Sequence, residues 1–409
     1  MNEQELAQLA KRDLEPLLAV KATIAASKVK RLKKGGRHPP GNNLWVSVPG
    51  PGKLEVSLRR SLPVSVWEAA ILQPYGAALA DLSGVPDSIA RHAADDVIVR
   101  AIAGQIGGDR VATVELVIRF LVRCAGSTYE GQPVHLNLLV DLDLATDTPA
   151  FDNLDVFQTR DWYAVLGSGV DTGVLVDSSG GVTRVVDVRG EPATAGIEQI
   201  HPDALRDLAA WTSTGNRVAL SLSRNREIAI QQHGALRYVF RSGRWRAFPV
   251  EVAISSSWSS GSGVGKSLKR AVLASAIDAS LGHHGACIAV VTKGQARRFR
   301  ESEIVRAEDR WPADVRSQLF STESFAELTR RQRVELLSMD GATVMDHTGK
   351  ILAAGAIVAV PGGSTGGGRL AATKALAEYG AALKVSQDGP IALYGLDANG
   401  LVTEKMAFA

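Results

Sequence analysis

A glycine-rich segment that runs into an alanine-rich stretch offers the clearest chemistry in the chain. Residues 360–380 read VPGGSTGGGRLAATKALAEYG, in which Gly366, Gly367 and Gly368 precede a single arginine, Arg369. Glycine lets the backbone approach a ligand closely, and the N-terminus of a helix presents free N–H groups and a partial positive charge. The segment therefore predicts an anion site, most simply for phosphate, strengthened by Arg369. A surface loop before a helix is the alternative.

Two further polar residues stand at the ends of expected strands. Asp340 lies in MDGATV, and the small residues Gly341 and Ala342 after it would let a flat ring lie against the chain. A carboxylate in that place can hold a divalent cation or accept a proton from a hydroxyl. Ser386, in KVSQDG, would offer a hydroxyl to a phosphate. A turn aspartate and a turn serine are the alternatives.

The elements that must position these residues alternate between helices and strands. We expect a helix over 267–282, a buried strand over 285–291, and a helix to about residue 338 that starts at a capping box at Ser324–Glu327. Two strands joined by a turn at 346–349 then precede the glycine-rich segment. This pattern predicts a C-terminal α/β (α+β) domain, in which a mixed sheet is flanked by helices.

The N-terminal half shows a different succession of predicted helices and strands. It predicts a helix over 3–27, mostly helices over 62–125, and then strands over 134–144, around a hairpin at 178–181 and through 217–248. We therefore expect three domains: a helical region with a basic segment over 1–130, a mixed α+β domain over 131–255, and the α/β domain over 256–409.

A basic run and a phosphate-loop-like run are weaker candidates. Lys28–Arg37 lies in KVKRLKKGGRHPPG and could bind nucleic acid, but no aromatic residues interleave the charges, so a solvated arm is favoured. The GVGKS sequence around Lys266 has Ser260 where the nucleotide-binding phosphate loop needs glycine, so a linker that enters a helix is favoured there.

Composition and charge narrow the class of protein. The chain has 409 residues, a formal net charge of +3 and two cysteines. Such a small net charge does not indicate overall binding to nucleic acid or membranes. No apolar run of about 18 residues and no signal peptide are evident, so we expect no membrane segment and a cytoplasmic protein with reduced thiols.

The ordered motifs of the last third resemble one enzyme family. They are, in chain order, Gly285-Ala286, Asp340-Gly341-Ala342, Val360-Pro361, Gly366–Arg369 and Val385-Ser386. From Gly285 to about Leu396 the chain is similar to the diadenylate cyclase domain of bacterial cyclic di-AMP synthases. Some members of that family carry a variable, presumed sensor region before the cyclase domain.

The resemblance implies a nucleotidyltransferase mechanism. Family members bind one ATP per domain with Mg²⁺ or Mn²⁺, and two facing domains condense two ATP molecules into cyclic di-AMP, a second messenger, with release of pyrophosphate. Asp340 would lie by the metal and the attacking hydroxyl. Gly341 and Ala342 would line the nucleotide pocket, and the glycines at 366–368, Arg369 and Ser386 would hold phosphates.

One motif departs from the family pattern. Where the family has Arg-His-Arg, this chain keeps a single charged residue, Arg369. Other cations could compensate, and the candidates are Lys374, Lys384, Arg330, Arg331 and Arg333. Two rival interpretations follow: a weakened, nucleotide-binding sensor of the same fold, or a function in the N-terminal half through Lys28–Arg37. The base of the nucleotide, the signal sensed and the resting oligomer are left open.

Overall fold

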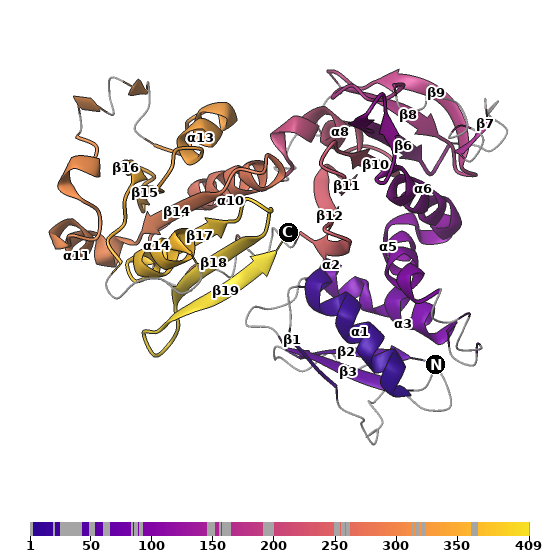
Figure 1. Cartoon of the computed structure of the whole chain (residues 1–409), viewed down its shortest axis with the longest axis horizontal. Coiled ribbons are helices and arrows are strands. Elements are labelled where there is room, and N and C mark those ends of the chain that lie inside the picture. Colours follow the sequence, from indigo (N-terminus) through magenta and orange to yellow (C-terminus); the bar gives the residue numbers. More distant parts are fainter. Residues whose placement is uncertain are drawn as a thin grey trace. The chain divides into compact units, whose positions relative to one another are not determined.

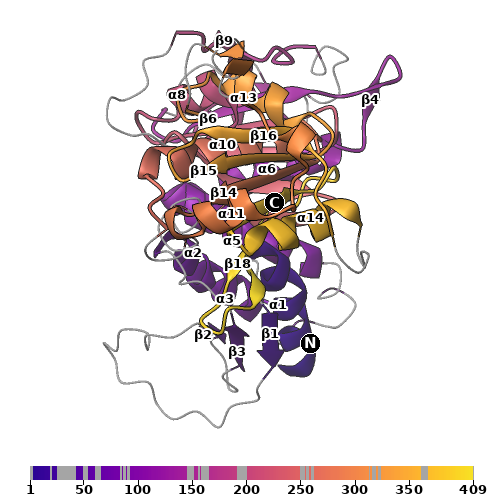
Figure 2. The same cartoon turned by 90° about the vertical axis from the view of Figure 1, so that its left-hand side faces the viewer.

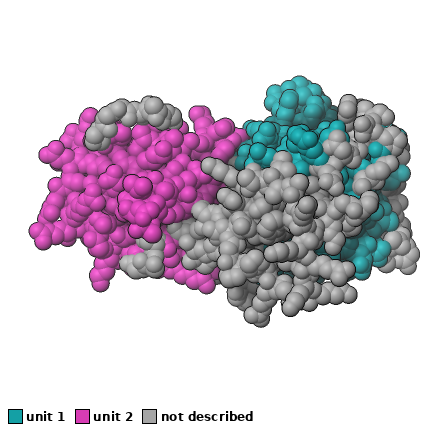
Figure 3. Space-filling model, turned by 90° about the horizontal axis from the view of Figure 1, so that it is seen from below, with its two compact units in different colours: residues 1–201, 205–249 teal, residues 202–204, 250–409 magenta. Residues whose placement is uncertain are grey.

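The computed structural model divides the chain into two compact units, coloured separately in Figure 3. Unit 1 holds residues 1–201 and 205–249, and unit 2 holds residues 202–204 and 250–409. The structure describes residues 3–18, 21–24, 43–48, 54–59, 66–82, 93–144, 152–154, 165–190, 200–248, 262–312, 324–360 and 367–408, with isolated positions between them. The basic run Lys28–Arg37 and Gly366 lie outside the described residues.

Unit 1 contains a small sheet next to its first helix. Strand order in this sheet is β1-β3-β2, with all pairs antiparallel. Its elements are α1 (Glu3–Leu18), β1 (Lys21–Ile24), β2 (Asn43–Val48) and β3 (Leu54–Arg59). The expected helix over 3–27 is thus wrong beyond Leu18, because residues 21–24 pair with β3. This sheet also corrects the expectation of a helical region with a basic segment over residues 1–130, because three strands lie within it.

A larger, eight-stranded sheet forms the body of unit 1 within the described residues. Its order is β13-β12-β11-β10-β6-β8-β9-β7. The strands are β6 (Leu136–Asp141), β7 (Asp152–Asn153), β8 (Thr172–Val176), β9 (Gly181–Asp187), β10 (Arg217–Leu222), β11 (Ile228–Gln232), β12 (Ala235–Arg241) and β13 (Arg244–Ala247). The strands and the hairpin expected from the sequence between 134 and 248 are confirmed. A separate two-residue ribbon pairs β4 (Thr128–Tyr129) with β5 (Gln132–Pro133).

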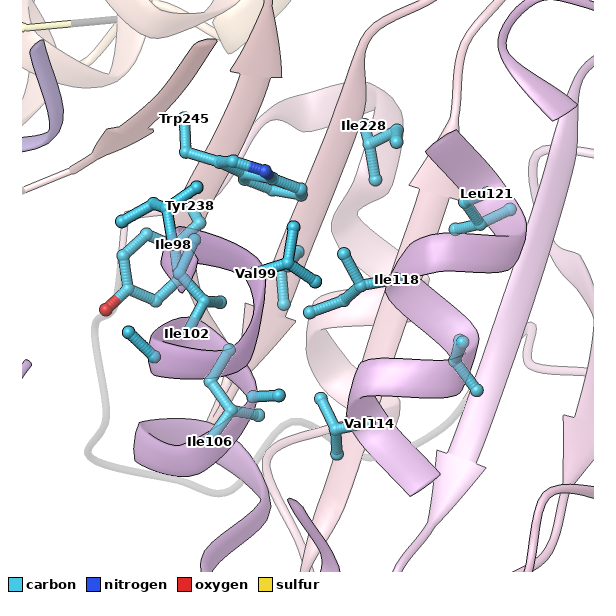
Figure 4. Close-up of a cluster of buried hydrophobic side chains, with 14 of the residues drawn as sticks. Ile98, Val99, Ile102, Ile106, Val114, Ile118, Leu121, Ile228, Tyr238 and Trp245 are labelled. Carbon is cyan, nitrogen blue, oxygen red and sulfur yellow. The ribbon is translucent and has the colours of Figure 1, made fainter. Parts of the chain in front are cut away.

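Helices close the core of unit 1. They are α2 (Val66–Ala70), α3 (Leu72–Ala80), α5 (Val97–Gly107), α6 (Val111–Cys124) and α8 (Arg206–Trp211). Figure 4 shows apolar side chains of α5 and α6 facing those of the sheet, such as Ile228, Tyr238 and Trp245. One continuous core runs from Leu6 to Ala247. The boundary that the sequence analysis expected near residue 130 does not separate two cores, because α5 and α6 bury their apolar faces on strands that follow it.

Unit 2 is a mixed six-stranded sheet between two layers of helices, seen in Figures 1 and 2. Strand order is β16-β15-β14-β17-β18-β19. The strands are β14 (Ala286–Val291), β15 (Ala342–Asp346), β16 (Ile351–Ala356), β17 (Gly380–Val385), β18 (Ile391–Leu396) and β19 (Val402–Phe408). The helices are α10 (Lys266–Leu281), α11 (Ala296–Glu301), α13 (Arg330–Leu337) and α14 (Gly368–Ala377). The predicted fold class, a mixed sheet flanked by helices, is confirmed.

Side-chain contacts assign the helices to the two faces of this sheet. Cys287 of β14 contacts Thr373 of α14, with 3.3 Å between Sγ and Oγ1. Thr343 of β15 points the other way and donates to the carbonyl of Leu336 in α13. Every residue of β14 is buried, because a central strand covered on both faces has no exposed side.

The helix expected to begin at Ser324 begins later. Thr329 is the N-cap of α13 and forms a capping box with Gln332, whose side chain accepts from the Thr329 backbone N–H. Ser324 instead forms an isolated β-bridge with Lys350. The capping-box pattern was therefore right in kind and wrong in position, since both sequences offer a hydroxyl residue followed three positions later by Glu or Gln.

Candidate functional site

The strand directions of unit 2 bring three distant segments to one edge of its sheet. β14 and β15 are parallel, with Cys287 opposite Ala342, whereas β14 and β17 are antiparallel, with Cys287 opposite Lys384. The starts of β14 and β15 and the end of β17 therefore share an edge. Neighbouring strands lie about 5 Å apart, so residues at this edge are within reach of one small ligand.

Gly341 shapes the start of β15. Its φ is +117°, a conformation that side chains disfavour, and a Cβ built there would lie 2.5 Å from the carbonyl carbon of Gly355. Both neighbours of Gly341 then take distinct roles. Ala342 is buried on the face that carries Cys287, while Asp340 is exposed at the edge of the sheet. The carboxylate is thus presented to solvent next to a tightly packed backbone.

Arg369 reaches this edge from the first turn of α14. The N-cap of the helix is Gly367, with a φ of +91°. A Cβ built on Gly285 would lie 2.6 Å from Cζ of Arg369, so the guanidinium group packs directly on the glycine that precedes β14. Continuing the strand register toward this end places Gly285 next to Asp340 on one side and Ser386 on the other. Arg369 therefore packs on the residue whose strand neighbours are the two polar positions that the sequence singled out.

Lys384 and Ser386 complete the set on β17. Because Lys384 stands directly opposite Cys287, its side chain projects from the face covered by α14. Ser386 follows two residues later, half-buried, and its backbone N–H donates to the Pro390 carbonyl at 2.8 Å. The edge thus combines two cations, one hydroxyl and one carboxylate.

The arginines of α13, considered as substitutes for the missing family cations, have structural partners instead. Arg330 pairs with the buried carboxylate of Asp278 at 2.7 Å, and Arg331 pairs with Glu335 at 3.1 Å. Arg333 is buried against the ring of Phe325, and burial lowers its pKa. Of the cations named from the sequence, Lys384 is the one best placed to join Arg369. Lys374 is exposed further along α14.

Most of the predicted site residues therefore lie together. The structure brings to one edge Asp340, Gly341, Ala342, Gly367, Gly368, Arg369 and Ser386. Gly355, against whose backbone Gly341 packs, was not among the residues expected from the sequence. The run of small residues AAGA at 353–356 was the available signal.

The burial of Cys287 adds one electrostatic feature beneath the site. Desolvation raises the pKa of this thiol to about 11, against the opposing effects of the Thr373 hydrogen bond and the Arg369 charge. The thiol is therefore neutral near pH 7 and acts as a packing residue under α14 rather than as a nucleophile.

The described residues of this edge do not form a metal centre by themselves. Within the described residues, no group of three or more His, Cys, Asp or Glu side chains is arranged to hold a metal ion. The exposed carboxylate of Asp340 nevertheless suits Mg²⁺ or Mn²⁺ held jointly with a substrate, because Mg²⁺ commonly takes one or two carboxylates together with phosphate oxygens.

Two cavities of about 570 and 800 Å³ lie in unit 1, and neither is lined by a residue of this candidate site.

Among the described helices, none has both the length and the apolar character needed to cross a lipid bilayer.

Comparison with known proteins yields little likeness. No protein-family model matches the chain, and no curated protein matches it. Among solved structures, DacA from Staphylococcus aureus (a double mutant) is 17% identical with a TM-score of 0.24, over 34% of this chain and 85% of DacA. A hypothetical membrane-spanning protein from Bacillus cereus is 17% identical with a TM-score of 0.25, over 37% of this chain and 67% of that one. At these values neither structure informs the function of this chain.

Proposed function

We propose that the chain is a diadenylate cyclase-type nucleotidyltransferase, which condenses two ATP molecules into cyclic di-AMP or a related cyclic dinucleotide. The observation that carries the proposal is the packing of Arg369 on Gly285, between the positions of Asp340 and Ser386. These residues come from separate motifs, and the family resemblance requires that they meet. The N-terminal unit would regulate the activity.

The reaction assigns a role to each group. The ribose 3′-oxygen of one ATP attacks the α-phosphorus of an ATP held by a facing copy of the chain. A new O–P bond forms while the bond to the β-phosphate breaks, so pyrophosphate leaves. Asp340 accepts the proton of the attacking hydroxyl. The 3′-oxygen of the second ATP then attacks the α-phosphorus of the first, a second pyrophosphate leaves, and the ring closes.

Positioning and electrostatics would supply most of the rate enhancement. Charge on the phosphate oxygens would be stabilised by Arg369, by Lys384 and by the free N–H groups at the start of α14. Ser386 would donate a hydrogen bond to a phosphate oxygen. A Mg²⁺ or Mn²⁺ ion held by Asp340 and the phosphates would add Lewis-acid stabilisation when bound.

The purified full-length chain tests this directly. After incubation with ATP and Mg²⁺ or Mn²⁺, mass spectrometry should detect cyclic di-AMP and pyrophosphate. The Asp340→Asn variant should lower turnover by about 10²- to 10⁴-fold, the usual contribution of a general base. Glu308→Gln, which removes an exposed carboxylate elsewhere in unit 2, should leave turnover unchanged. Full activity in Asp340→Asn would remove the role assigned to that carboxylate.

A second function, a nucleotide sensor of the same fold, is favoured by one observation. The chain keeps only one of the three polar residues of the family's Arg-His-Arg motif. Each lost charged contact costs about 1.5–3 kcal/mol, which could abolish turnover while ATP still binds. ATP binding by calorimetry without product under either metal would favour the sensor, and absence of ATP binding would contradict both functions.

A further inference from the structure

A cavity of about 570 Å³ opens in unit 1 between α1, α5, α6 and the β12–β13 hairpin. Its volume falls within the range of small-molecule sites in proteins, about 300–1,000 Å³. All of its lining residues belong to unit 1, so the cavity is independent of the nucleotide chemistry proposed for unit 2.

The apolar part of the cavity is preformed. Ile98, Val99 and Trp245 line it and are at least nine-tenths buried. Figure 4 shows the indole of Trp245 beside Val99 and Tyr238, within the main core of unit 1. Phe240 lies 5.2 Å from the Trp245 ring at a tilt of 47° and also lines the cavity. A flat apolar group could therefore pack here without first opening the core.

Most of the charged residues that line the cavity form ion pairs with one another. Arg12 donates to Asp13 at 2.8 Å and to Asp95 at 2.7 Å, and Arg119 pairs with Asp96. The three aspartates that line the cavity are thus matched to two arginines, which fixes their positions.

The Asp13 carboxylate is held especially firmly. It is buried, and it also accepts a hydrogen bond from the Tyr75 hydroxyl at 2.9 Å. The Asp13 carboxylate therefore has its hydrogen-bond partners within the protein and does not need a ligand to satisfy it.

Arg244 is the exception. It is exposed at the start of β13, next to Trp245, and within the described residues its side chain has no ion pair or hydrogen bond. Arg123 also lines the cavity, with its guanidinium 6.0 Å from the Phe120 ring. Arg119 is also bound by Glu115 at 2.6 Å, so Arg244 is the lining cation that adds a positive charge next to the aromatic residues.

From these features we infer that this cavity is a ligand site for a small amphipathic anion, namely a planar apolar body that carries one carboxylate or sulfonate group. The body packs on Trp245, Phe240 and Val99, and the anionic group pairs with Arg244. Guanidinium groups bind such anions through paired N–H donors, which makes Arg244 the residue that selects for charge.

A pair of matched fluorescent probes tests the inference on the full chain. 8-Anilinonaphthalene-1-sulfonate has the predicted shape and charge, and N-phenyl-1-naphthylamine has the same rings without the sulfonate. Both should bind with one-to-one stoichiometry and an emission shift to shorter wavelength. The Arg244→Gln variant should weaken the sulfonate about tenfold, a typical loss for one charged contact, and leave the neutral probe within about twofold. Arg184→Gln, an equal charge change on exposed β9, should alter neither.

Hydrogen-exchange mass spectrometry locates the bound probe without any substitution. The sulfonate should increase protection in residues 93–107 and 238–247. The variant Val99→Phe, which fills the cavity, should weaken both probes if circular dichroism shows that it folds. Equal sulfonate affinity in the wild type and Arg244→Gln, or protection confined to other segments, would show adventitious binding and overturn the inference.

Discussion

Gly341 is required by backbone geometry, whatever chemistry Asp340 performs. Its positive φ and its contact with the backbone of Gly355 leave no space for a side chain. The small residue after Asp340 was noted in the sequence as room for a nucleotide ring. The structure adds that the glycine also allows β15 and β16 to approach, so substitution there would disturb stability and site together.

Gly341→Ala should therefore destabilise unit 2. Strain at such a backbone conformation costs about 1–3 kcal/mol, and the clash with Gly355 adds to it. Urea unfolding should show a loss of at least about 2 kcal/mol. Gly294→Ala is the matched control, because a Cβ there meets nothing within 4 Å. Equal stability of the two variants would contradict this account.

The buried thiol of Cys287 predicts a pH dependence. Its pKa is raised by burial from the ordinary value of 9.0 to about 11, so the folded state keeps a proton that the unfolded state loses above pH 9. The stabilisation is complete below pH 9 and falls as the pH rises toward 11, by an amount of about 2–3 kcal/mol. Urea unfolding between pH 8 and 11 should show a shallower decline for Cys287→Ala than for the wild type, whereas parallel declines would count against it.

At the scale of elements, the sequence predicts those helices and strands that contain many apolar residues at regular spacing. The apolar run at 286–291 and the helix before it lie where the pattern places them. β2 and β3 were not predicted, although Leu44, Val46 and Val48 stand at every second position of β2, because Trp45 between them interrupts the alternation of apolar and polar residues.

The candidate site was predictable as a set of motifs but not as a geometry. Asp340 and Ser386 could be named because each follows or precedes a recognisable strand. Sequence gives no strand order, so the contact of Arg369 with Gly285 and the alignment of Lys384 with Cys287 required the pairing of β14 with both β15 and β17. Gly366 lies outside the described residues, and its role stays a prediction.

The two capping-box sequences make opposite predictions about α13. Thr329→Ala removes a side chain that accepts from the Gln332 backbone N–H, so it should destabilise unit 2 by about 1 kcal/mol in urea unfolding. Ser324→Ala should cost less, because Ser324 lies five residues before the N-cap and outside the helix. A larger loss in Ser324→Ala than in Thr329→Ala would contradict the assignment of Thr329 as the N-cap that stabilises α13.

At the scale of the whole molecule, the chain divides its features between two units. Unit 2 holds the candidate nucleotide site, and unit 1 holds the cavity that Arg244 lines. Each has its own apolar core. Ligand binding and turnover can therefore be measured as separate properties of one chain.

The proposed condensation needs two chains, which predicts a concentration dependence. If facing copies meet only transiently, the rate per chain should rise with protein concentration and level off once dimers form. A titration of turnover against protein concentration, with analytical ultracentrifugation at the same concentrations, measures both. Mixing the wild type with excess Asp340→Asn should reduce the rate per wild-type chain. A rate per chain that is independent of concentration, in a sample that stays monomeric, would contradict the two-chain reaction.

The parallel pairing of β14 with β15 determines where the sequence of this domain can gain or lose residues during evolution. Two parallel neighbours cannot be joined by a tight turn, so the chain must travel back through residues 292–341 before the second strand starts. The register between β14 and β15 is fixed by their hydrogen bonds and not by the length of this connecting segment. Insertions or deletions at its surface turns would leave the pairing of the two strands unchanged, so this segment can vary in length while Asp340 keeps its place at the edge.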